Sequence, residues 1–200
     1  MLGKCRLLSG EQHGDVFKDL KKDGLRYAET GGWYANIGFW VGAIYRFGVW
    51  ANSLPGLARV LPWLAYRMAR ACVRIVFNVD IWAGRGGSRI GAGLCLLHPS
   101  NVIIKNGTVI GENCLIFHEV TLGHGPIPGS PNVGNDVDIY VGARILGGVT
   151  IGDQSMIGPN CVVMADVPPR SVVLPPTNLR IPRGLSPIAT QADNGKRAVG

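Results

Sequence analysis

A six-residue period governs the chain between Val133 and Val163. A β-branched aliphatic residue returns at every sixth position of this stretch: Val133, Ile139, Ile145, Ile151, Ile157 and Val163. A hexapeptide period is typical of parallel β-helices, in which one repeat is too short to bury its own apolar side chain and is stabilised by stacking on the next. A β-sandwich would instead alternate with period two between turn clusters. The period therefore predicts a β-helix.

Weaker repeats extend this prediction toward the N-terminus. Residues 78–122 carry aliphatics in the same frame, with a slip of two residues between Val102 and Ile104. The Gly- and Pro-rich segment 123–132 breaks the frame and is predicted to leave the coil as a loop. We therefore expect three parts: an N-terminal helical region (1–77), a β-helix domain (78–182, with the loop 123–132) and a flexible polar tail (183–200).

Residues 33–77 are rich in Trp, Tyr and Arg at helical spacing and predict two or three short helices. Two interpretations stay open. The helices pack on the β-helix and on neighbouring subunits, or they make a peripheral contact with a membrane, because aromatic and Arg side chains suit the headgroup boundary. No run is long enough to span a bilayer before Arg46 interrupts it.

Charge and cysteine usage narrow the function classes. The net charge is +7, but Lys and Arg are scattered, which argues against a nucleic-acid partner and is compatible with an anionic ligand or membrane surface. The five cysteines are odd in number and lack C-x-x-C spacing, as expected in a reducing compartment without disulfides or a zinc knuckle. The first 30 residues carry no apolar signal-peptide core. We expect a cytoplasmic protein, with the inner face of the membrane as an alternative location.

Three titratable residues form the candidate catalytic group. In known left-handed β-helices three hexapeptides make one triangular turn, so positions 18 residues apart stack. Asp80 and His98 are 18 apart, and His118 joins them after correction for the slip. We predict that all three share one corner on successive coils, where Asp80 orients His98 as a general base. The alternative is that both histidines are satisfied structural corner residues.

Several stretches carry a family resemblance: Val79-Asp80-Ile81, Ile90-Gly91-Ala92-Gly93, His98, Val120-Thr121-Leu122-Gly123, the run 143–152, and the run from Val162 to Pro169. Through them the segment 77–180 resembles hexapeptide acyltransferases of the serine acetyltransferase type. In particular it resembles the O-acetyltransferases of bacterial exopolysaccharide and capsule pathways.

The resemblance implies a left-handed parallel β-helix that forms a homotrimer and uses acetyl-CoA as co-substrate. The family's catalytic Asp and His fall on Asp80 and His98. Its acetyl-CoA groove lies between neighbouring subunits, and its walls fall on Gly123, His124, Val141, Met156, Gly158 and Pro159. No metal is expected.

Departures from the family pattern point to the acceptor. Serine acetyltransferases have Asp where this chain has Leu97, and an Arg-His pair where it has Gly129 and Ser130. Those residues hold the charged groups of the amino acid, and a site without them rejects a zwitterion. His118 stands where the serine enzymes commonly have Gln and matches a His of exopolysaccharide-type relatives. We therefore predict that acetyl is transferred to a sugar or exopolysaccharide hydroxyl.

Three alternatives stay open. The first is a true serine O-acetyltransferase. The second is a zinc enzyme like the β-helical carbonic anhydrases, with His98, His118 and His124 as ligands. The third is a non-catalytic trimeric scaffold.

Overall fold

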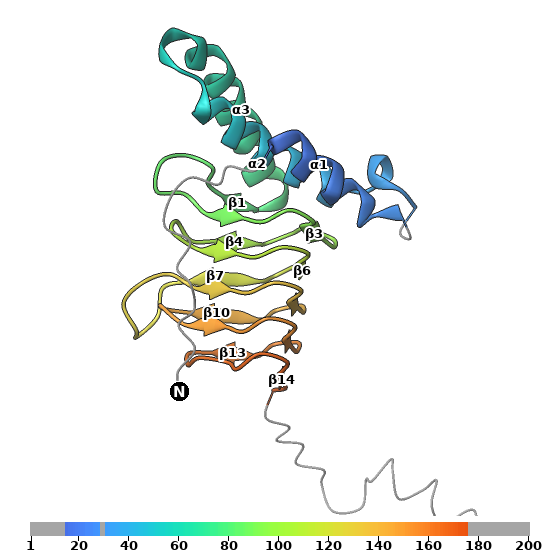
Figure 1. Ribbon diagram of the computed structural model, residues 1–200, viewed down its shortest axis with the longest axis vertical. Helices are drawn as coiled ribbons and strands as arrows, with labels where there is room; N and C mark the ends of the chain where they lie inside the picture. The colour runs from blue at the N-terminus through green and yellow to red at the C-terminus, as the bar shows by residue number, and fades with distance from the viewer. Residues whose placement is uncertain (1–14, 29–30, 176–200) are drawn as a thin grey trace, which may run out of the picture.

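The computed structural model describes residues 15–28 and 31–175, so the predicted tail 183–200 lies outside the described residues. Its β-strands form three parallel sheets, and successive strands pass from one sheet to the next, three to a turn. The strands are short and stack in coils along one axis (Figure 1). The chain is therefore a mainly-β parallel β-helix, as predicted.

Up to β13, each sheet takes every third strand of the chain. In the last coil the second sheet is continued only by an isolated bridge between Ile151 and Val167, so β14 follows β13 directly and joins the third sheet. The first sheet contains β1 (Asp80–Ile81), β4 (Ile103–Ile104), β7 (Thr121–Gly123), β10 (Arg144–Leu146) and β13 (Val162–Val163). The second contains β2 (Arg89–Ile90), β5 (Val109–Ile110), β8 (Asn132–Val133) and β11 (Thr150–Ile151). The third contains β3 (Cys95–Leu96), β6 (Leu115–Ile116), β9 (Asp138–Ile139), β12 (Met156–Ile157) and β14 (Val172–Val173).

The periodic aliphatics form the core, as predicted. All six between Val133 and Val163 are at most 5% exposed. They stack in register, so that Ile139 pairs with Ile116 on one side and with Ile157 on the other. Full burial of an aliphatic side chain of this size stabilises the folded state by about 1.5–3 kcal/mol.

The predicted slip of two residues lies at one corner of the coil. Leu96 pairs with Ile116, 20 positions on, whereas Ile104 pairs with Leu122, 18 positions on. The corner between β3 and β4 is therefore two residues longer than the corner between β6 and β7. A second insertion, in the turn between β1 and β2, was not predicted, because Trp82 to Ser88 shows no break as obvious as that of the loop 123–132.

The N-terminal region is helical, as predicted. It contains α1 (Val16–Leu25), the 3-10 turn η2 (Trp33–Ala35), α2 (Ile37–Ser53), the 3-10 turn η3 (Gly56–Arg59) and α3 (Val60–Phe77). Asp15 caps α1 by accepting a hydrogen bond from the Phe17 N–H at 3.2 Å. Asn78 ends α3 with a left-handed φ of 51°. The helices cover the β1 end of the β-helix (Figure 1). Among the described residues, no helix is long and apolar enough to cross a membrane.

A buried ion pair joins these helices to the β-helix. Arg46 on α2 donates to Asp23 on α1 from Nε at 2.9 Å and from Nη2 at 3.1 Å. The same guanidinium donates to the carbonyls of Ile90 and Gly91 at 2.7 and 2.6 Å. Asp23 Oδ1 also accepts two backbone N–H groups from the turn between β2 and β3, each at 2.8 Å. The cluster therefore fixes α1 and α2 against the first coil.

Candidate active site

The predicted histidines lie on one edge of the β-helix, where strands of the third sheet turn into strands of the first. We call this the histidine edge; it comprises residues 97–102, 117–120, 140–143 and 158–161. Because Leu96 pairs with Ile116 and Ile116 with Ile139, His98, His118 and Val141 each stand two positions past a paired strand residue. The prediction that His98 and His118 share a corner on successive coils is confirmed.

Left-handed backbone makes the sharp turn at this edge. Glu119, Gly142 and Asn160 stand at equivalent positions and have φ values of 60°, 70° and 55°. In the longer first corner both His98 and Asn101 adopt such values, 52° and 54°. A non-glycine residue with positive φ is uncommon and is found mostly where the surrounding structure demands it. The two inserted residues therefore make His98 bulge outward, and its side chain is exposed.

The predicted register of Asp80 is wrong. Asp80 pairs with Ile103, 23 positions on, so it stands on β1 in the row that contains Ile103 and Thr121. It therefore follows the edge instead of lying in the column of the two histidines. The physical reason is that the first coil carries both insertions, so a spacing of 18 residues does not complete it.

Two arginines of α3 hold the Asp80 carboxylate. Arg70 Nη2 donates to Asp80 Oδ1, and Arg74 Nε lies 4.0 Å from Oδ2. Arg70 is itself fixed, because its Nε donates to the Ile81 carbonyl at 3.1 Å and its guanidinium stacks over the Trp82 ring at 4.8 Å. Among the described residues, no hydrogen bond joins Asp80 to His98. The predicted Asp–His pair is therefore an Asp–Arg pair in this structure.

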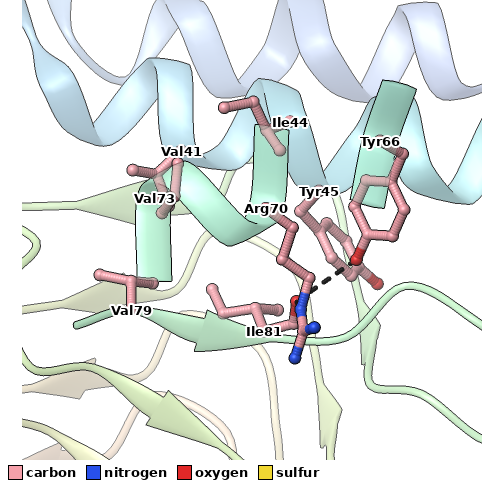
Figure 2. A pocket seen from close by; sticks show the side chains of 8 residues that line it. All are labelled: Val41, Ile44, Tyr45, Tyr66, Arg70, Val73, Val79 and Ile81. Atoms are coloured by element: carbon pink, nitrogen blue, oxygen red, sulfur yellow. Dashed lines mark hydrogen bonds between the residues drawn. The ribbon is translucent and has the colours of Figure 1, made fainter. Parts of the chain in front are cut away.

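A small apolar pocket lies behind this ion pair, between α2, α3 and β1. Figure 2 shows Tyr66 and Arg70 converging on the backbone of Ile81, with Val41 and Val73 on the opposite wall. Tyr66 also accepts a hydrogen bond from the Ala83 N–H at 3.0 Å. Neither predicted histidine lines this pocket, so it supports Arg70 and does not form part of the histidine edge.

These arginines were not predicted from the sequence, although a signal was present. Arg70 and Arg74 stand four residues apart, so they share a helix face. A basic helix face directly before Asp80, the acidic residue at the start of the β-helix, predicts an ion pair between the two. A second missed feature is a stacked pair of rings on the histidine edge: Phe117 and Tyr140 lie 5.0 Å apart at an interplanar angle of 15°.

The residues matched to the acetyl-CoA groove lie at two separate places. Val141, Gly158 and Pro159 belong to the histidine edge, and Met156 stands on β12 just before it. Gly123 ends β7, and His124 opens the following loop at the far end of the first sheet. One chain therefore presents five of these six residues on two edges of the first sheet, with Met156 beside one of them on the third sheet.

The loop between β7 and β8 projects from the side of the β-helix (Figure 1). Its far end is tied to the coil before it, because Lys105 Nζ donates to the Gly129 carbonyl at 2.7 Å and Ser130 Oγ donates to the Asn106 carbonyl at 2.9 Å. On the other side of the loop, the Gly148 N–H of the following coil donates to the Ile127 carbonyl at 3.0 Å. Ser130 thus has a structural partner, and Leu97 packs against the apolar cluster of Tyr27, Phe39 and Cys95.

Cysteine chemistry does not contribute to this edge. Burial raises the pKa of the Cys114 thiol to about 11, and it also raises the pKa of Cys95 and of Cys161. A thiol with a raised pKa is a poor nucleophile. Within residues 15–28 and 31–175, no three or more His, Cys, Asp or Glu side chains are grouped so that they could hold a metal ion. His98, His118 and His124 therefore do not form a zinc site within one chain.

Sequence comparison finds serine acetyltransferases. Over 126 residues the chain is 38% identical to serine acetyltransferase of Mycobacterium tuberculosis, a match that covers 58% of this chain and 54% of that protein. Over 115 residues it is 37% identical to serine acetyltransferase of Helicobacter pylori, covering 54% and 66%. The chain thus spans between about half and two thirds of these relatives. No family model matches the chain.

Structural comparison agrees. Serine acetyltransferase of Neisseria gonorrhoeae in complex with serine superposes with a TM-score of 0.67 at 26% identity, covering 81% of this chain and 67% of that one. The enzyme of Brucella abortus in complex with coenzyme A gives a TM-score of 0.63 at 25% identity, covering 80% and 64%. The chain is therefore similar in sequence and in fold to hexapeptide-repeat acyltransferases of the serine acetyltransferase type.

Proposed function

We propose that this protein is an acetyl-CoA-dependent O-acetyltransferase. The observation that carries the proposal is that an exposed histidine, His98, bulges from the β-helix edge at the position matched to the family's catalytic histidine. The similarity to serine acetyltransferases over more than half of the chain supports the same reaction class.

The mechanism uses one proton and one thioester. His98 removes the proton from an acceptor hydroxyl, and the oxygen attacks the acetyl carbonyl carbon of acetyl-CoA. The C–S bond then breaks, and the coenzyme A thiolate takes the proton from the imidazolium. Asp80 stands at the start of the strand that follows the edge, where Arg70 holds its carboxylate. It makes no hydrogen bond to His98, so we propose that it acts on the imidazolium only through its charge. His118, one coil away, positions the acceptor or shares the role of base with His98.

A homotrimer would complete the acetyl-CoA site. The residues matched to the groove lie on two edges of the first sheet, so no single chain gathers them around one ligand. In a closed ring of three copies, one subunit's histidine edge faces the loop between β7 and β8 of its neighbour. The thioester would bind between them, against Val141, Gly158 and Pro159 from one copy and against Gly123 and His124 from the other.

Serine is the first candidate acceptor. Both relatives named above are serine acetyltransferases, and one of the similar structures is a complex with serine. This evidence favours serine over the sugar hydroxyl predicted from the sequence. The same evidence gives no support to the exopolysaccharide or capsule type.

A sugar hydroxyl is the second candidate, and the side chains at three positions favour it. Where the family places charged groups that hold the amino acid, this chain has Leu97, Gly129 and Ser130. Leu97 packs into an apolar cluster, and Ser130 bonds a backbone carbonyl. Neither is available to pair with an ammonium or a carboxylate group, and leaving such groups unpaired in a site costs affinity.

Release of free coenzyme A thiol from acetyl-CoA tests the reaction, with L-serine in one arm and a panel of sugars and polysaccharide repeat units in the other. The key variant is His98→Asn, because Asn tolerates the left-handed backbone of this position and the side chain is exposed. We expect turnover to fall by about 10²–10⁴-fold, the usual contribution of general base catalysis.

Gln154→Asn serves as the matched control, since Gln154 is also exposed with a left-handed φ and stands on a different edge. This variant should keep wild-type turnover. Wild-type turnover by a folded His98→Asn protein would refute the proposed base. No thiol release from the wild type with any acceptor would refute the reaction class.

A further inference from the structure

The outer face of η3 and α3 carries large apolar side chains that are more than half exposed. Five of them form what we call the α3 stripe: Leu57, Leu61, Leu64, Met68 and Ile75. Their side chains are 89%, 77%, 55%, 62% and 83% exposed. Isolated exposed apolar residues are ordinary, but a contiguous row marks an interaction surface.

Helical geometry shows that these residues form a single row. At about 100° per residue, the spacings of three, four and seven positions place the four residues of α3, Leu61, Leu64, Met68 and Ile75, within a narrow arc of the helix. Leu57 lies in the 3-10 turn η3 that precedes it. The opposite face of α3 carries Tyr66, Arg70 and Val73, which pack toward α2 and β1. α3 is therefore apolar on two faces, and the fold covers only one of them.

The charge around the α3 stripe is of one sign. Arg67 and Arg74 lie together on one side of the row and are exposed, and Arg74 Nε also lies 4.0 Å from Asp80 Oδ2. Between residues 31 and 79 the chain contains no Asp or Glu, although it contains five Arg. The helical layer thus presents apolar side chains beside cations with no anionic partner on the same element.

We propose that the α3 stripe is a docking surface for a membrane that contains anionic lipids. An amphipathic helix whose apolar row is bordered by basic side chains lies in the plane of the interface, with its apolar face among the acyl chains and its cations among the headgroups. Each basic residue near an anionic leaflet strengthens binding several-fold. The contact is peripheral, because no described helix is long and apolar enough to cross the bilayer.

A second copy of the chain fits this surface less well. The spacing of the α3 stripe would also suit helix pairing, but pairing two such helices would bring Arg67 of each copy to an interface whose helices carry no acidic residue. A lipid headgroup layer supplies the missing negative charge and a self-contact does not.

Aromatic side chains at the other end of the helical layer are of the type found at headgroup level. Trp33, Tyr34 and Trp40 are 47%, 69% and 48% exposed. Trp40 Nε1 donates to the Tyr34 carbonyl at 3.2 Å, so the aromatic group is held together before any contact forms. Trp and Tyr are enriched where a protein meets the headgroup region.

Vesicle flotation of the purified full chain tests the proposal. The vesicles are phosphatidylcholine alone, or phosphatidylcholine mixed with phosphatidylglycerol. We expect the wild type to float with the mixed vesicles and to remain at the bottom with the neutral ones. Raising the ionic strength from about 0.1 M to about 1 M shortens the Debye length from about 10 Å to about 3 Å and should release the protein.

Two variants separate the apolar from the electrostatic contribution. The triple variant Leu61→Gln, Leu64→Gln, Met68→Gln should weaken flotation by about tenfold or more, because it removes three inserted side chains. Arg67→Gln should weaken it by about fivefold. All four positions are exposed, so these variants keep the fold, and circular dichroism verifies that.

Matched controls come from the β-helix. Val162→Thr, Met164→Gln and Val172→Thr together remove three exposed apolar side chains elsewhere, and Arg85→Gln removes an exposed cation. Both controls should float like the wild type. Equal loss in the controls, equal flotation with neutral vesicles, or no flotation at all would overturn the proposal. A smaller mass by light scattering for the triple variant, without wild-type flotation, would identify the α3 stripe as a contact between copies.

Discussion

Breaking the buried ion pair between Arg46 and Asp23 should strongly destabilise this protein. Both side chains are only 3% exposed, and the guanidinium makes four hydrogen bonds of 2.6–3.1 Å to the carboxylate and to two carbonyls. Arg46→Met fills much of the same volume but leaves the Asp23 charge buried without its partner. Removing one member of a buried pair costs about 3–5 kcal/mol.

The consequence can be measured directly. For a chain of this size, each kcal/mol shifts Tm by about 2–4 °C, so Arg46→Met should lower Tm by about 6–20 °C. Urea unfolding, followed by circular dichroism, gives the free energy of unfolding. Arg46→Lys should fall between the wild type and Arg46→Met, because Lys keeps the charge and loses the planar fork that contacts carboxylate and carbonyls together.

A second ion pair provides the control. Lys22 on α1 also bonds the β-helix, with Nζ 2.6 Å from Glu112, but both side chains are about half exposed. Lys22→Met should therefore cost no more than about 1 kcal/mol. If Arg46→Met lowered the free energy of unfolding as little as Lys22→Met does, burial would not determine how strongly these ion pairs hold the helices on the β-helix. That result would refute the prediction.

Three further predictions follow from local geometry. Arg70→Met should reduce the rate of acetyl transfer by about tenfold, because Asp80 loses the hydrogen bond that positions it. Arg74→Met should change the rate by less than about threefold, because Arg74 Nε lies 4.0 Å from Asp80 Oδ2. Equal effects of the two substitutions would count against a positioning role for Arg70. Gly38→Ala should lower the free energy of unfolding by about 1–3 kcal/mol, because a Cβ there meets the β3 backbone; a urea midpoint equal to wild type would contradict that close approach. In a Cys5→Ser background, a thiol reagent at neutral pH should label Cys72, which is exposed, and leave Cys114 unlabelled until the protein unfolds; rapid native labelling of Cys72→Ser would show that the buried thiols are accessible.

The hexapeptide period was sufficient to predict the β-helix and its core. Each repeat contributes one short strand and one inward-facing aliphatic side chain. The burial of Ile139, Ile145 and Ile151 could therefore be predicted from their spacing alone. The corner shared by His98 and His118 was equally predictable, because only one slip separates their coils. Local periodicity carries this information, since stacking involves neighbours at a fixed distance along the chain.

Tertiary structure decided what periodicity could not. The register of Asp80 depends on two insertions in the first coil, and the frame of hexapeptides is too weak there to reveal the one between β1 and β2. The partner of Asp80 comes from α3, and the exposure of the α3 stripe depends on which face of that helix the β-helix covers. A solenoid fixes contacts between adjacent coils from sequence spacing alone, whereas the docking of a helix onto it is set by side-chain packing between distant segments.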